Sequence, residues 1–486
     1  MNLKKLAYKL KSFEKLKERI LIQRKSQLFM LWDLVNQEDM KGNLTNLIGF
    51  FSVQQHLVQF CPELYTEADN KFLLSQSSSL LEVSITEFAK QNDYKKLLKL
   101  KGELLVYILG MKRLGLIKND NLLNTLIQHN ETYLYQLFES ISIRIKAVCE
   151  AETYINIEVN DKKDIKRYVE YYGIELLYDD VEFPLFLPYS LMVKDINDLT
   201  QVAIDEIYAY CKHLFNEETD YVLFYGSIDK LVWCIIDVLT QYFVFETQNT
   251  ILQIAIVWNN IEFLKRSITF YQSWAYKHCK NKSAFEYNYT ATSQFNQLKS
   301  RCEEKLYNEF RAKMNEFLTY VEDQNWYPKQ ENECHNEYIM YIVEWLTLNL
   351  QTLEVHNADI VYSAAVTCFQ HFCSKFMEIL ATSKHITKIN MNGIYNLKLD
   401  LQFVEAYINE SLKENYPRTY TALNELRQFI ALMQGNVMDI MNDEIYRNQF
   451  SALQMHKLQQ ILKKFKDKSK DSEIKKLLKA LKNKKS

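Results

Sequence analysis

The side chains of this sequence that could hold a metal ion gather at two places. Cys368, His371 and Cys373 fall within six residues, and thiolate and imidazole groups are usual ligands of Zn²⁺. On a helix, positions 368 and 373 point about 140° apart, so the two thiols would converge poorly on one ion. We interpret all three as buried side chains of an apolar helix. The pair Cys334 and His335 lies in a polar stretch with no further ligands beside it.

A run of carboxylates at Asp179, Asp180 and Glu182 is the other arrangement that could do chemistry. It resembles the aspartate motif of all-α isoprenoid synthases, which needs carboxylates at i, i+1 and i+4 to bridge magnesium and diphosphate. Position i+4 is Phe183 here, so we interpret the run as an acidic linker. The sequence also lacks G-x-x-x-x-G-K-S/T, G-x-S-x-G, H-E-x-x-H and the EF-hand loop. We therefore expect no catalytic activity, no metal and no cofactor.

The composition indicates an all-α fold. The chain has 486 residues but only 9 Gly and 5 Pro, where average usage would give about 34 and about 24. Sheets need turns, and turns depend on these two residue types. The 32 Tyr, 27 Phe and 6 Trp supply the apolar surface of a folded protein. The longest apolar stretch, which begins at Leu231, is too short and too polar to span a bilayer.

The cysteines and the N-terminus indicate a cytoplasmic protein. Nine Cys are scattered without disulfide-like spacing, and no signal peptide is recognisable. We divide the chain into N-terminal amphipathic or coiled-coil helices for subunit packing at 1–150, helical bundles at 151–300 and 301–452, and a Lys-rich tail at 453–486. The segment 151–188 has some β character and two prolines, and helical periods resume at Leu199.

A strongly patterned helix follows Asn390, which is a suitable N-cap. Its apolar positions recur at spacings of three and four, and a second apolar row lies roughly opposite: Ile394, Leu397, Leu401, Val404 and Ile408, then Leu399, Phe403 and Tyr407. The only continuous polar stripe is Lys398, Gln402, Glu405 and Asn409. We expect a helix wedged between neighbours with one edge in water. Asn392 and Gly393 are explained as residues that tolerate an irregular turn.

The last thirty residues are strongly basic. From Lys457 to Lys485 there are 12 Lys against three acids, a net charge of +9, so the rest of the chain carries −11 of the total −2. Three interpretations stay open: a solvated, frayed terminus, a basic helix lying on an anionic leaflet, or a last packed helix. The apolar period beneath the lysines is Ile461, Leu462, Phe465, Ile474, Leu477, Leu478 and Leu481.

An anionic membrane is the polyanion that the tail would favour, because the acidic remainder of the chain would repel nucleic acid. The candidate lipid-binding residues are Lys463, Lys464, Lys466, Lys475 and Lys476. At roughly 1 kcal/mol per lysine, four or five of them would give about millimolar affinity, which is useful only beside a second contact.

Several motifs, in the right order over about 180–460, resemble the exocyst subunit family called Sec fifteen. They are Pro188-Tyr-Ser-Leu-Met-Val193, Phe317 followed by Asn325-Trp326, the small-residue helix Ala364 to Leu380, Ile389-Asn-Met391, Leu399-Asp400 with Glu405, and Glu425-Leu-Arg-Gln428. The sequence departs from the family at Lys194, which replaces its second Pro, at Asn392, which replaces its Gly, and at Lys398, which replaces its Asn. Family members are also distinctly longer.

The resemblance implies an elongated rod of stacked helical bundles and a non-enzymatic vesicle tether. Members of this family belong to an octameric complex that docks secretory vesicles at the plasma membrane before fusion. Their C-terminal domain binds a GTP-loaded Rab, and their N-terminal part packs with the Sec ten subunit. The stripe of Lys398, Gln402, Glu405 and Asn409 is then the candidate Rab surface. The alternatives are another helical-rod tether, Golgi or endosomal, and an all-α metal-dependent enzyme.

Overall fold

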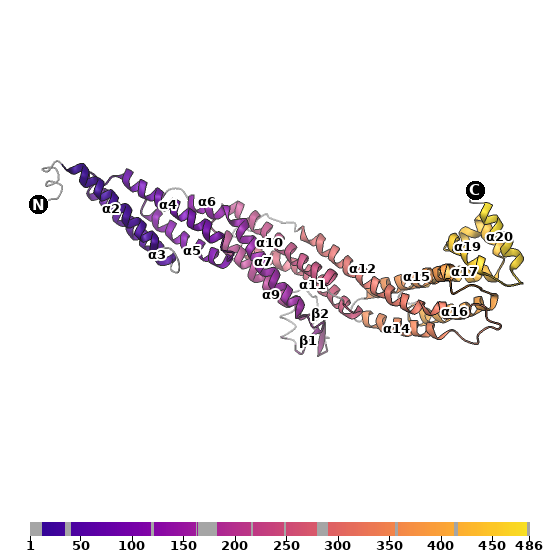
Figure 1. The fold of residues 1–486 in the computed structure, drawn as a ribbon. Coiled ribbons are helices and arrows are strands. Elements are labelled where there is room, and N and C mark those ends of the chain that lie inside the picture. The colour runs from indigo at the N-terminus through magenta and orange to yellow at the C-terminus, as the bar shows by residue number, and fades with distance from the viewer. Residues whose placement is uncertain are drawn as a thin grey trace. The chain divides into compact units, whose positions relative to one another are not determined.

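The computed structural model describes residues 12–34, 40–117, 121–161, 163, 182–214, 217–246, 249–278, 290–354, 358–412 and 417–483. Asp179 and Asp180 of the acidic run lie outside them. The expectation of an all-α fold is confirmed, because β1 (Asn156–Val159) and β2 (Leu185–Ser190) are the only strands in these ranges (Figure 1). None of the described helices combines the length and apolar character that crossing a membrane would require.

The chain forms two compact units, and each unit is built from three separate segments. Unit 1 comprises Met1–Ala151, Lys194–Val238 and Ser267–Thr292, and unit 2 comprises Glu152–Val193, Leu239–Arg266 and Ser293–Ser486. The division of the sequence into four consecutive domains stays a prediction.

The helices of the first half are α2 (Phe13–Leu34), α3 (Met40–Phe60), α4 (Glu67–Ala89), α5 (Tyr94–Arg113), α6 (Asn121–Gln128), α7 (Asn130–Glu150), α9 (Leu191–Cys211), α10 (Glu217–Leu239), the π-helix η1 (Thr240–Glu246) and α11 (Ile251–His278). Capping side chains mark the start of two of them, α4 and α5. Thr66 and Asp69 form a reciprocal capping box at the start of α4. Asp93 accepts hydrogen bonds from the first amides of α5.

Inside unit 1, α5 and α7 are fastened to the C-terminal end of α9. The ring of Tyr133 stacks on that of Tyr210 with centroids 3.9 Å apart. The Nζ of Lys101, a residue only 4% exposed, donates to the backbone oxygens of Ala209 at 2.7 Å and Lys212 at 2.5 Å. The lysine thus places its charge on the unpaired carbonyls at the end of a helix, where the helix dipole favours a cation.

The predicted β character before α9 is confirmed by the antiparallel pair β1 and β2, in which Glu158 lies opposite Phe186. Their inner side chains are buried, and the Tyr189 ring lies 4.3 Å from that of Phe263. The predicted restart of helix at Leu199 was wrong, because α9 begins at Leu191. Buried Met192, Val193 and Ile196 extend its apolar period back to the strand.

Unit 2 contains the remaining helices, several of which pack on α15 (Figure 1). They are α12 (Ala291–Leu318), α13 (Tyr320–Asp323), α14 (Glu337–Glu354), α15 (Ala358–Thr382), α16 (Met391–Ser411), the 3₁₀ helix η2 (Pro417–Leu423), α17 (Asn424–Gln434), the 3₁₀ helix η3 (Val437–Met441), α18 (Asp443–Gln449), α19 (Met455–Lys464) and α20 (Asp471–Asn483). Helix α15 packs against α14, η2, α17 and α19.

The three candidate metal ligands on α15 have separate surroundings. Cys368 and Cys373 are fully buried, and burial raises the pKa of both thiols. His371 is only half-buried, so its interpretation as a buried side chain was wrong. It reaches Asn315 of α12, with its Nε2 2.8 Å from the amide oxygen. Both thiols therefore pack as small apolar side chains, as the sequence interpretation expected.

Candidate partner-binding surface

The start of α16 is held tightly against the chain around Trp326. The Oδ1 of Asn390 accepts a hydrogen bond from the Gly393 amide at 3.0 Å, so the predicted N-cap is confirmed. The Asn390 amide donates to the Trp326 carbonyl at 3.1 Å. A Cβ on Gly393 would lie 2.6 Å from that same carbonyl oxygen. The explanation of Gly393 by an irregular turn was therefore wrong, since the glycine is needed for the close approach of two backbone segments.

A second polar row, which the sequence analysis missed, runs along α16 at Asn392, Asn396 and Asp400. It faces the segment between α13 and α14. The Nδ2 of Asn392 donates to the Pro328 carbonyl at 3.2 Å, and the Oδ1 of Asn396 accepts from the Asn332 amide at 2.7 Å. The spacing of four residues between these three polar side chains is the signal that could have revealed the row.

Asp400 is the most buried member of this row, with 1% of its surface exposed. Its Oδ1 accepts from the Asn336 amide at 2.7 Å, and its Oδ2 accepts from Asn336 Nδ2 at 2.8 Å and from the Tyr338 hydroxyl at 3.1 Å. Burial raises the pKa of Asp400, although these hydrogen bonds oppose the shift. The carboxylate thus fixes the segment that precedes α14 onto α16.

The second apolar row of α16 is only partly covered. The Phe403 ring stacks against His335, with centroids 3.8 Å apart. Burial raises the pKa of Tyr407, and the nearby Thr347 side chain of α14 opposes that shift. These contacts place α14 and the loop before it beside α16, as expected for a wedged helix.

The four residues of the predicted Rab surface differ in their surroundings. Gln402 and Asn409 are exposed, and Lys398 is half-buried. Glu405 has only 19% of its side chain exposed, because its Oε1 accepts from Arg427 of α17 at 2.7–2.8 Å. Arg427 also lies over the Tyr420 ring at 3.8 Å. Glu405 therefore forms part of the α16–α17 contact, and Lys398, Gln402 and Asn409 remain to form an open edge.

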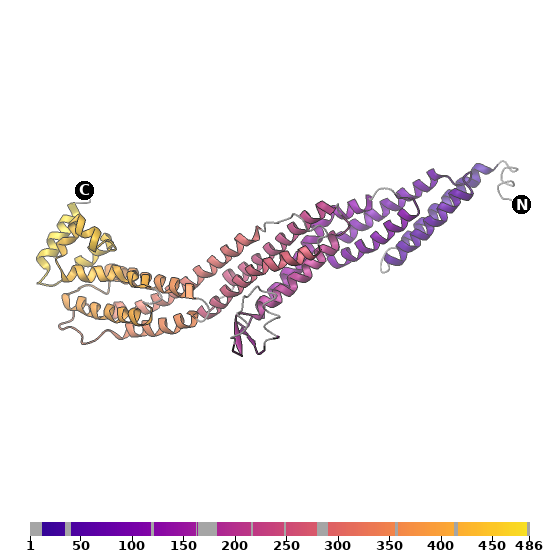
Figure 2. The same cartoon turned by 180° about the vertical axis from the view of Figure 1, so that it is seen from behind.

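The Lys-rich tail packs as the last helices of unit 2. Most of its apolar period is buried, and only Leu478 is half-exposed: Ile461, Leu462, Phe465, Ile474, Leu477 and Leu481 are 0–5% exposed. Helix α19 packs against α15, and α20 packs against α19 and η3. Of the three open interpretations, the packed helix therefore holds over the described part of the tail, up to residue 483 (Figure 2).

Lys464 was wrongly grouped with the lipid-facing lysines. Its Nζ donates to the carbonyls of Leu380 at 2.8 Å and Ser383 at 2.7 Å, at the end of α15. Burial lowers the pKa of Lys464. The other four candidates, Lys463, Lys466, Lys475 and Lys476, are exposed.

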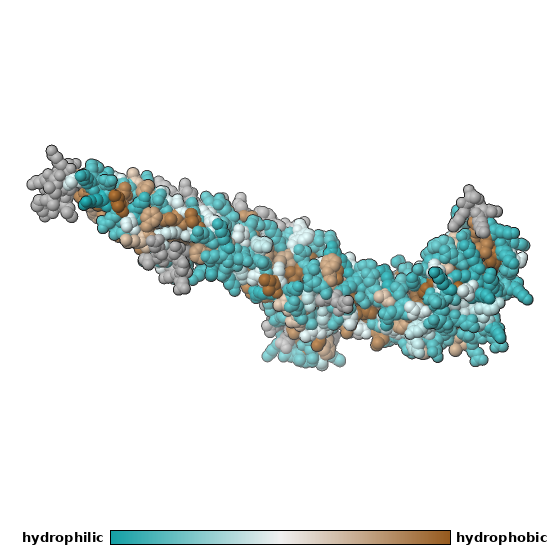
Figure 3. All heavy atoms as spheres, in the orientation of Figure 1, coloured by the Kyte–Doolittle hydropathy of each residue, from teal (hydrophilic) through white to brown (hydrophobic). Residues whose placement is uncertain are grey.

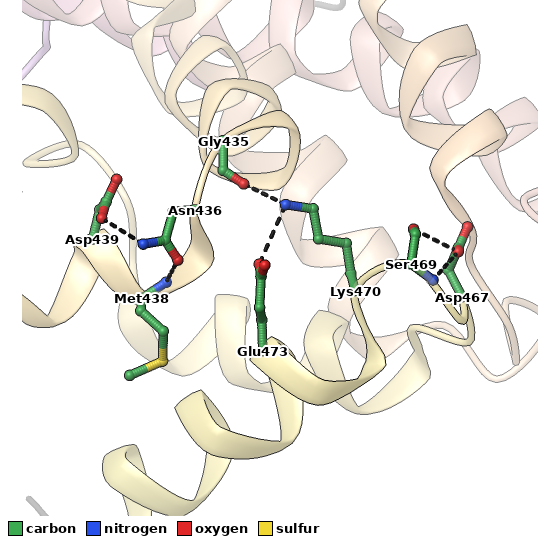
Figure 4. A network of polar contacts seen from close by, with 8 residues as sticks. All are labelled: Gly435, Asn436, Met438, Asp439, Asp467, Ser469, Lys470 and Glu473. Carbon is green, nitrogen blue, oxygen red and sulfur yellow. Dashed lines mark hydrogen bonds and ion pairs between the residues drawn. The ribbon is translucent and has the colours of Figure 1, made fainter.

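The turn between α19 and α20 is fastened to the start of α16 and to the end of α17. The Ile389 amide donates to the Lys464 carbonyl at 3.0 Å, and the Met391 amide donates to Asp467 Oδ2 at 3.0 Å. Lys470 of the same turn contacts the Gly435 carbonyl and Glu473 (Figure 4). Burial would raise the pKa of Asp467, but hydrogen bonds from Met391 and Ser469 outweigh it and lower the pKa.

The helices at the N-terminal end of unit 1 leave large apolar side chains in solvent (Figure 3). Val53 and Phe60 are 47% and 78% exposed and lie seven residues apart on α3. On α2, Ile22 and Met30 are 60% and 64% exposed. Seven-residue spacing of exposed apolar side chains is typical of a face that packs on another helix.

Comparison with known proteins finds similarity to subunits of the exocyst complex. The family model described as "Exocyst complex subunit Sec15 C-terminal" matches residues 121–464. Exocyst complex component SEC15A of Arabidopsis thaliana is 22% identical over 469 residues, which cover 93% of this chain and 58% of the relative. Exocyst complex component 6 of Dictyostelium discoideum is 22% identical over 305 residues, covering 58% of this chain and 29% of the relative.

The chain thus spans little more than half the length of SEC15A and less than a third of the Dictyostelium relative. Among solved structures, the crystal structure of the Sec15 C-terminal domain matches with a TM-score of 0.48 and 14% identity, over 65% of this chain and 99% of that one.

Proposed function

The chain belongs to the Sec15 family of exocyst subunits, and on this basis we propose that it is a non-enzymatic tether that holds secretory vesicles at the plasma membrane before fusion. The observation that carries the proposal is the family match over residues 121–464. Such a protein acts in the cytoplasm and is recruited to vesicles and to the plasma membrane.

Purification of the tagged full chain from its own cells, followed by mass spectrometry, tests this function. We expect the other exocyst subunits to copurify. Recovery of a Golgi or endosomal tethering complex in their place would contradict the proposal.

The proposed assembly contact is the apolar face of the N-terminal helices, and the Sec ten subunit is the proposed direct partner. Val53 and Phe60 on α3 are exposed at a seven-residue spacing, which fits a helix laid along them. Replacing both with Glu should abolish copurification of Sec ten. The matched variant Tyr135→Glu together with Ile143→Glu makes the same kind of change at exposed positions of α7 (67% and 68% exposed), elsewhere on unit 1, and should leave it intact.

The proposed Rab contact is the open edge of α16 formed by Lys398, Gln402 and Asn409. A GTP-loaded GTPase is recognised because the nucleotide orders the switch loops that an effector touches. Lys398→Glu should weaken binding of the GTP-loaded form, measured with a non-hydrolysable GTP analogue against GDP. Lys388→Glu, an exposed lysine with the same charge change in the loop before α16, is the control and should bind normally.

A weak contact with an anionic membrane is proposed for the exposed lysines Lys463, Lys466, Lys475 and Lys476. Because the apolar side of α19 and α20 is buried in unit 2, the contact would be electrostatic, without insertion. Four lysines at roughly 1 kcal/mol each give about millimolar affinity. Binding to vesicles with a phosphatidylserine fraction should therefore disappear at high salt, and salt-resistant binding would contradict this contact.

A further inference from the structure

One carboxylate joins the turn between α19 and α20 to the start of α16. The Oδ2 of Asp467 accepts from the Met391 amide, in the first turn of α16, at 3.0 Å. Its Oδ1 accepts from the Ser469 hydroxyl at 2.7 Å and from the Ser469 amide at 2.9 Å (Figure 4). Ser469 therefore supports the same carboxylate that satisfies one of the unpaired amides of the α16 start.

The surroundings of Ser469 set it apart from the other hydroxyls of the chain. Ser469 is exposed, and its direct neighbours are Lys468 and Lys470, with Lys466 three positions before it. Ser300 is the only other serine or threonine in the sequence with a basic residue on both sides. Because Ser300 lies in the middle of α12, Ser469 alone combines this charge pattern with a position outside a helix.

The turn that carries Ser469 can open without unwinding a helix. A protein kinase transfers a phosphoryl group only to a hydroxyl that lies in line with the γ-phosphate of ATP, so the segment must enter the kinase cleft. The backbone hydrogen bond across the turn, from the Lys470 amide to the Asp467 carbonyl, is 3.3 Å long, against a usual length of about 2.9–3.0 Å. Opening there breaks few contacts, which is typical of segments of low local stability.

We propose that Ser469 is a phosphorylation site for a serine kinase with an acidic substrate groove, and that the phosphate releases the turn from the start of α16. In the transfer, the Ser469 Oγ bonds to the γ-phosphorus of ATP while the bond from that phosphorus to the departing ADP oxygen breaks. The hydroxyl proton passes to the catalytic Asp of the kinase. This modification goes beyond the proposed function and does not depend on it.

The phosphate would act on both anchors of the turn. A phosphoserine carries a charge of roughly −1.5 to −2 at pH 7, and its oxygens are acceptors. The donor to Asp467 Oδ1 is then lost, and two anions repel each other across the former hydrogen bond. As Asp467 moves away, its Oδ2 leaves the Met391 amide. Lys470, which contacts the Gly435 carbonyl and Glu473, is drawn toward the phosphate, so the anchor at the end of α17 loosens too.

The site is tested on the full chain purified from its own cells in the presence of phosphatase inhibitors. Cleavage after glutamate gives the peptide 445–473, which contains both Ser469 and Ser472, and its fragments locate a phosphate by mass spectrometry. Ser472 is an internal control, because its neighbours are Asp471 and Glu473. We expect phosphate on Ser469. A peptide without phosphate, or with phosphate on Ser472 alone, would overturn the assignment.

The release of the turn is tested on full chains that carry phosphoserine installed at position 469 or at position 472. Hydrogen exchange of peptides covering residues 389–393 reports on the Met391 amide. Its protection should fall about tenfold or more with phosphoserine at 469, as for one lost hydrogen bond to a charged group. Phosphoserine at 472 adds the same charge in the first turn of α20 and should change it less than twofold. Equal or slower exchange with phosphoserine at 469 would refute the release.

One consequence of the modification rests on the proposed function. The phosphate lowers the positive charge beside Lys463 and Lys466, so binding to phosphatidylserine vesicles should weaken about tenfold or more. If the unmodified chain binds such vesicles and the chain with phosphoserine at 469 binds them equally well, this consequence is refuted. If the unmodified chain binds no vesicles, the membrane contact fails, whereas the exchange measurement still decides whether phosphorylation releases the turn.

Discussion

Replacing Gly393 with Ala should destabilise the start of α16, although alanine is the better helix former. The new Cβ would lie 2.6 Å from the Trp326 carbonyl oxygen and 3.2 Å from its carbon. Both are backbone atoms, so no rotamer change relieves the overlap, and overpacking of this kind costs about 1–3 kcal/mol. Moving the carbonyl away would also lengthen its hydrogen bond from Asn390, worth about 1 kcal/mol.

Helix propensity acts in the opposite direction by up to about 1 kcal/mol. The balance is a net loss of about 1–3 kcal/mol, located at the α16 start. Gly102→Ala is the control, because Gly102 lies in α5 with nothing within 4 Å of its Cβ position. It should stabilise α5 by about 0.5–1 kcal/mol.

Hydrogen exchange, measured peptide by peptide in each variant, locates the change in stability. Amides of residues 390–397 should exchange faster in Gly393→Ala, and amides of α5 should exchange more slowly in Gly102→Ala. Unchanged or slower exchange at 390–397 would refute the argument, because it would mean that the Trp326 carbonyl does not approach Gly393 as closely as described.

Three further predictions concern polar contacts of unit 2. Asp400→Asn should destabilise the unit by about 1–3 kcal/mol, because one amide nitrogen would face the donors of Asn336 and Tyr338; urea unfolding measures it, and an unchanged midpoint would contradict it. Lys464→Met should cost about 1.5–3 kcal/mol through the lost charged hydrogen bonds to the end of α15, whereas exposed Lys463→Met should stay within about 0.5 kcal/mol. The lowered pKa of Asp467 means that its carboxylate stabilises the fold above the ordinary Asp pKa of about 3.9. Protection of the Met391 amide should therefore stay constant above that pH and fall as the pH drops below about 3.9 and through the lower pKa of the folded state. Asp467→Asn should remove the dependence.

The class of fold and several local details followed from the sequence for clear reasons. A chain with so few Gly and Pro cannot form the many turns of a sheet protein, whatever the positions of these residues. Composition alone therefore predicted helices. The cap at Asn390 depends only on residues within three positions of it. Such features are local, and the sequence displays them directly.

The features that were missed depend on partners far away in the sequence. Gly393 is explained by Trp326 and Asp400 by Asn336, each more than sixty positions earlier. Lys464 differs from Lys463 because the two lie on different faces of α19. Lys457, Ile461 and Lys464 recur at spacings of four and three, and Lys457 is also buried, with its Nζ 2.9 Å from the Ser374 carbonyl. That spacing could have placed Lys464 on the inner face.

The order in which the two units can fold is set by the threading of the chain. Unit 1 needs residues up to Thr292, so its first helices leave the ribosome long before their last partners do. Lys101, for example, cannot form its hydrogen bonds until Ala209 and Lys212 have been synthesised. During that interval its neighbours present unpaired apolar faces, which are the surfaces that chaperones bind. A nascent chain arrested at residue 151 should thus remain bound to a chaperone, and one arrested well beyond residue 292 should be released.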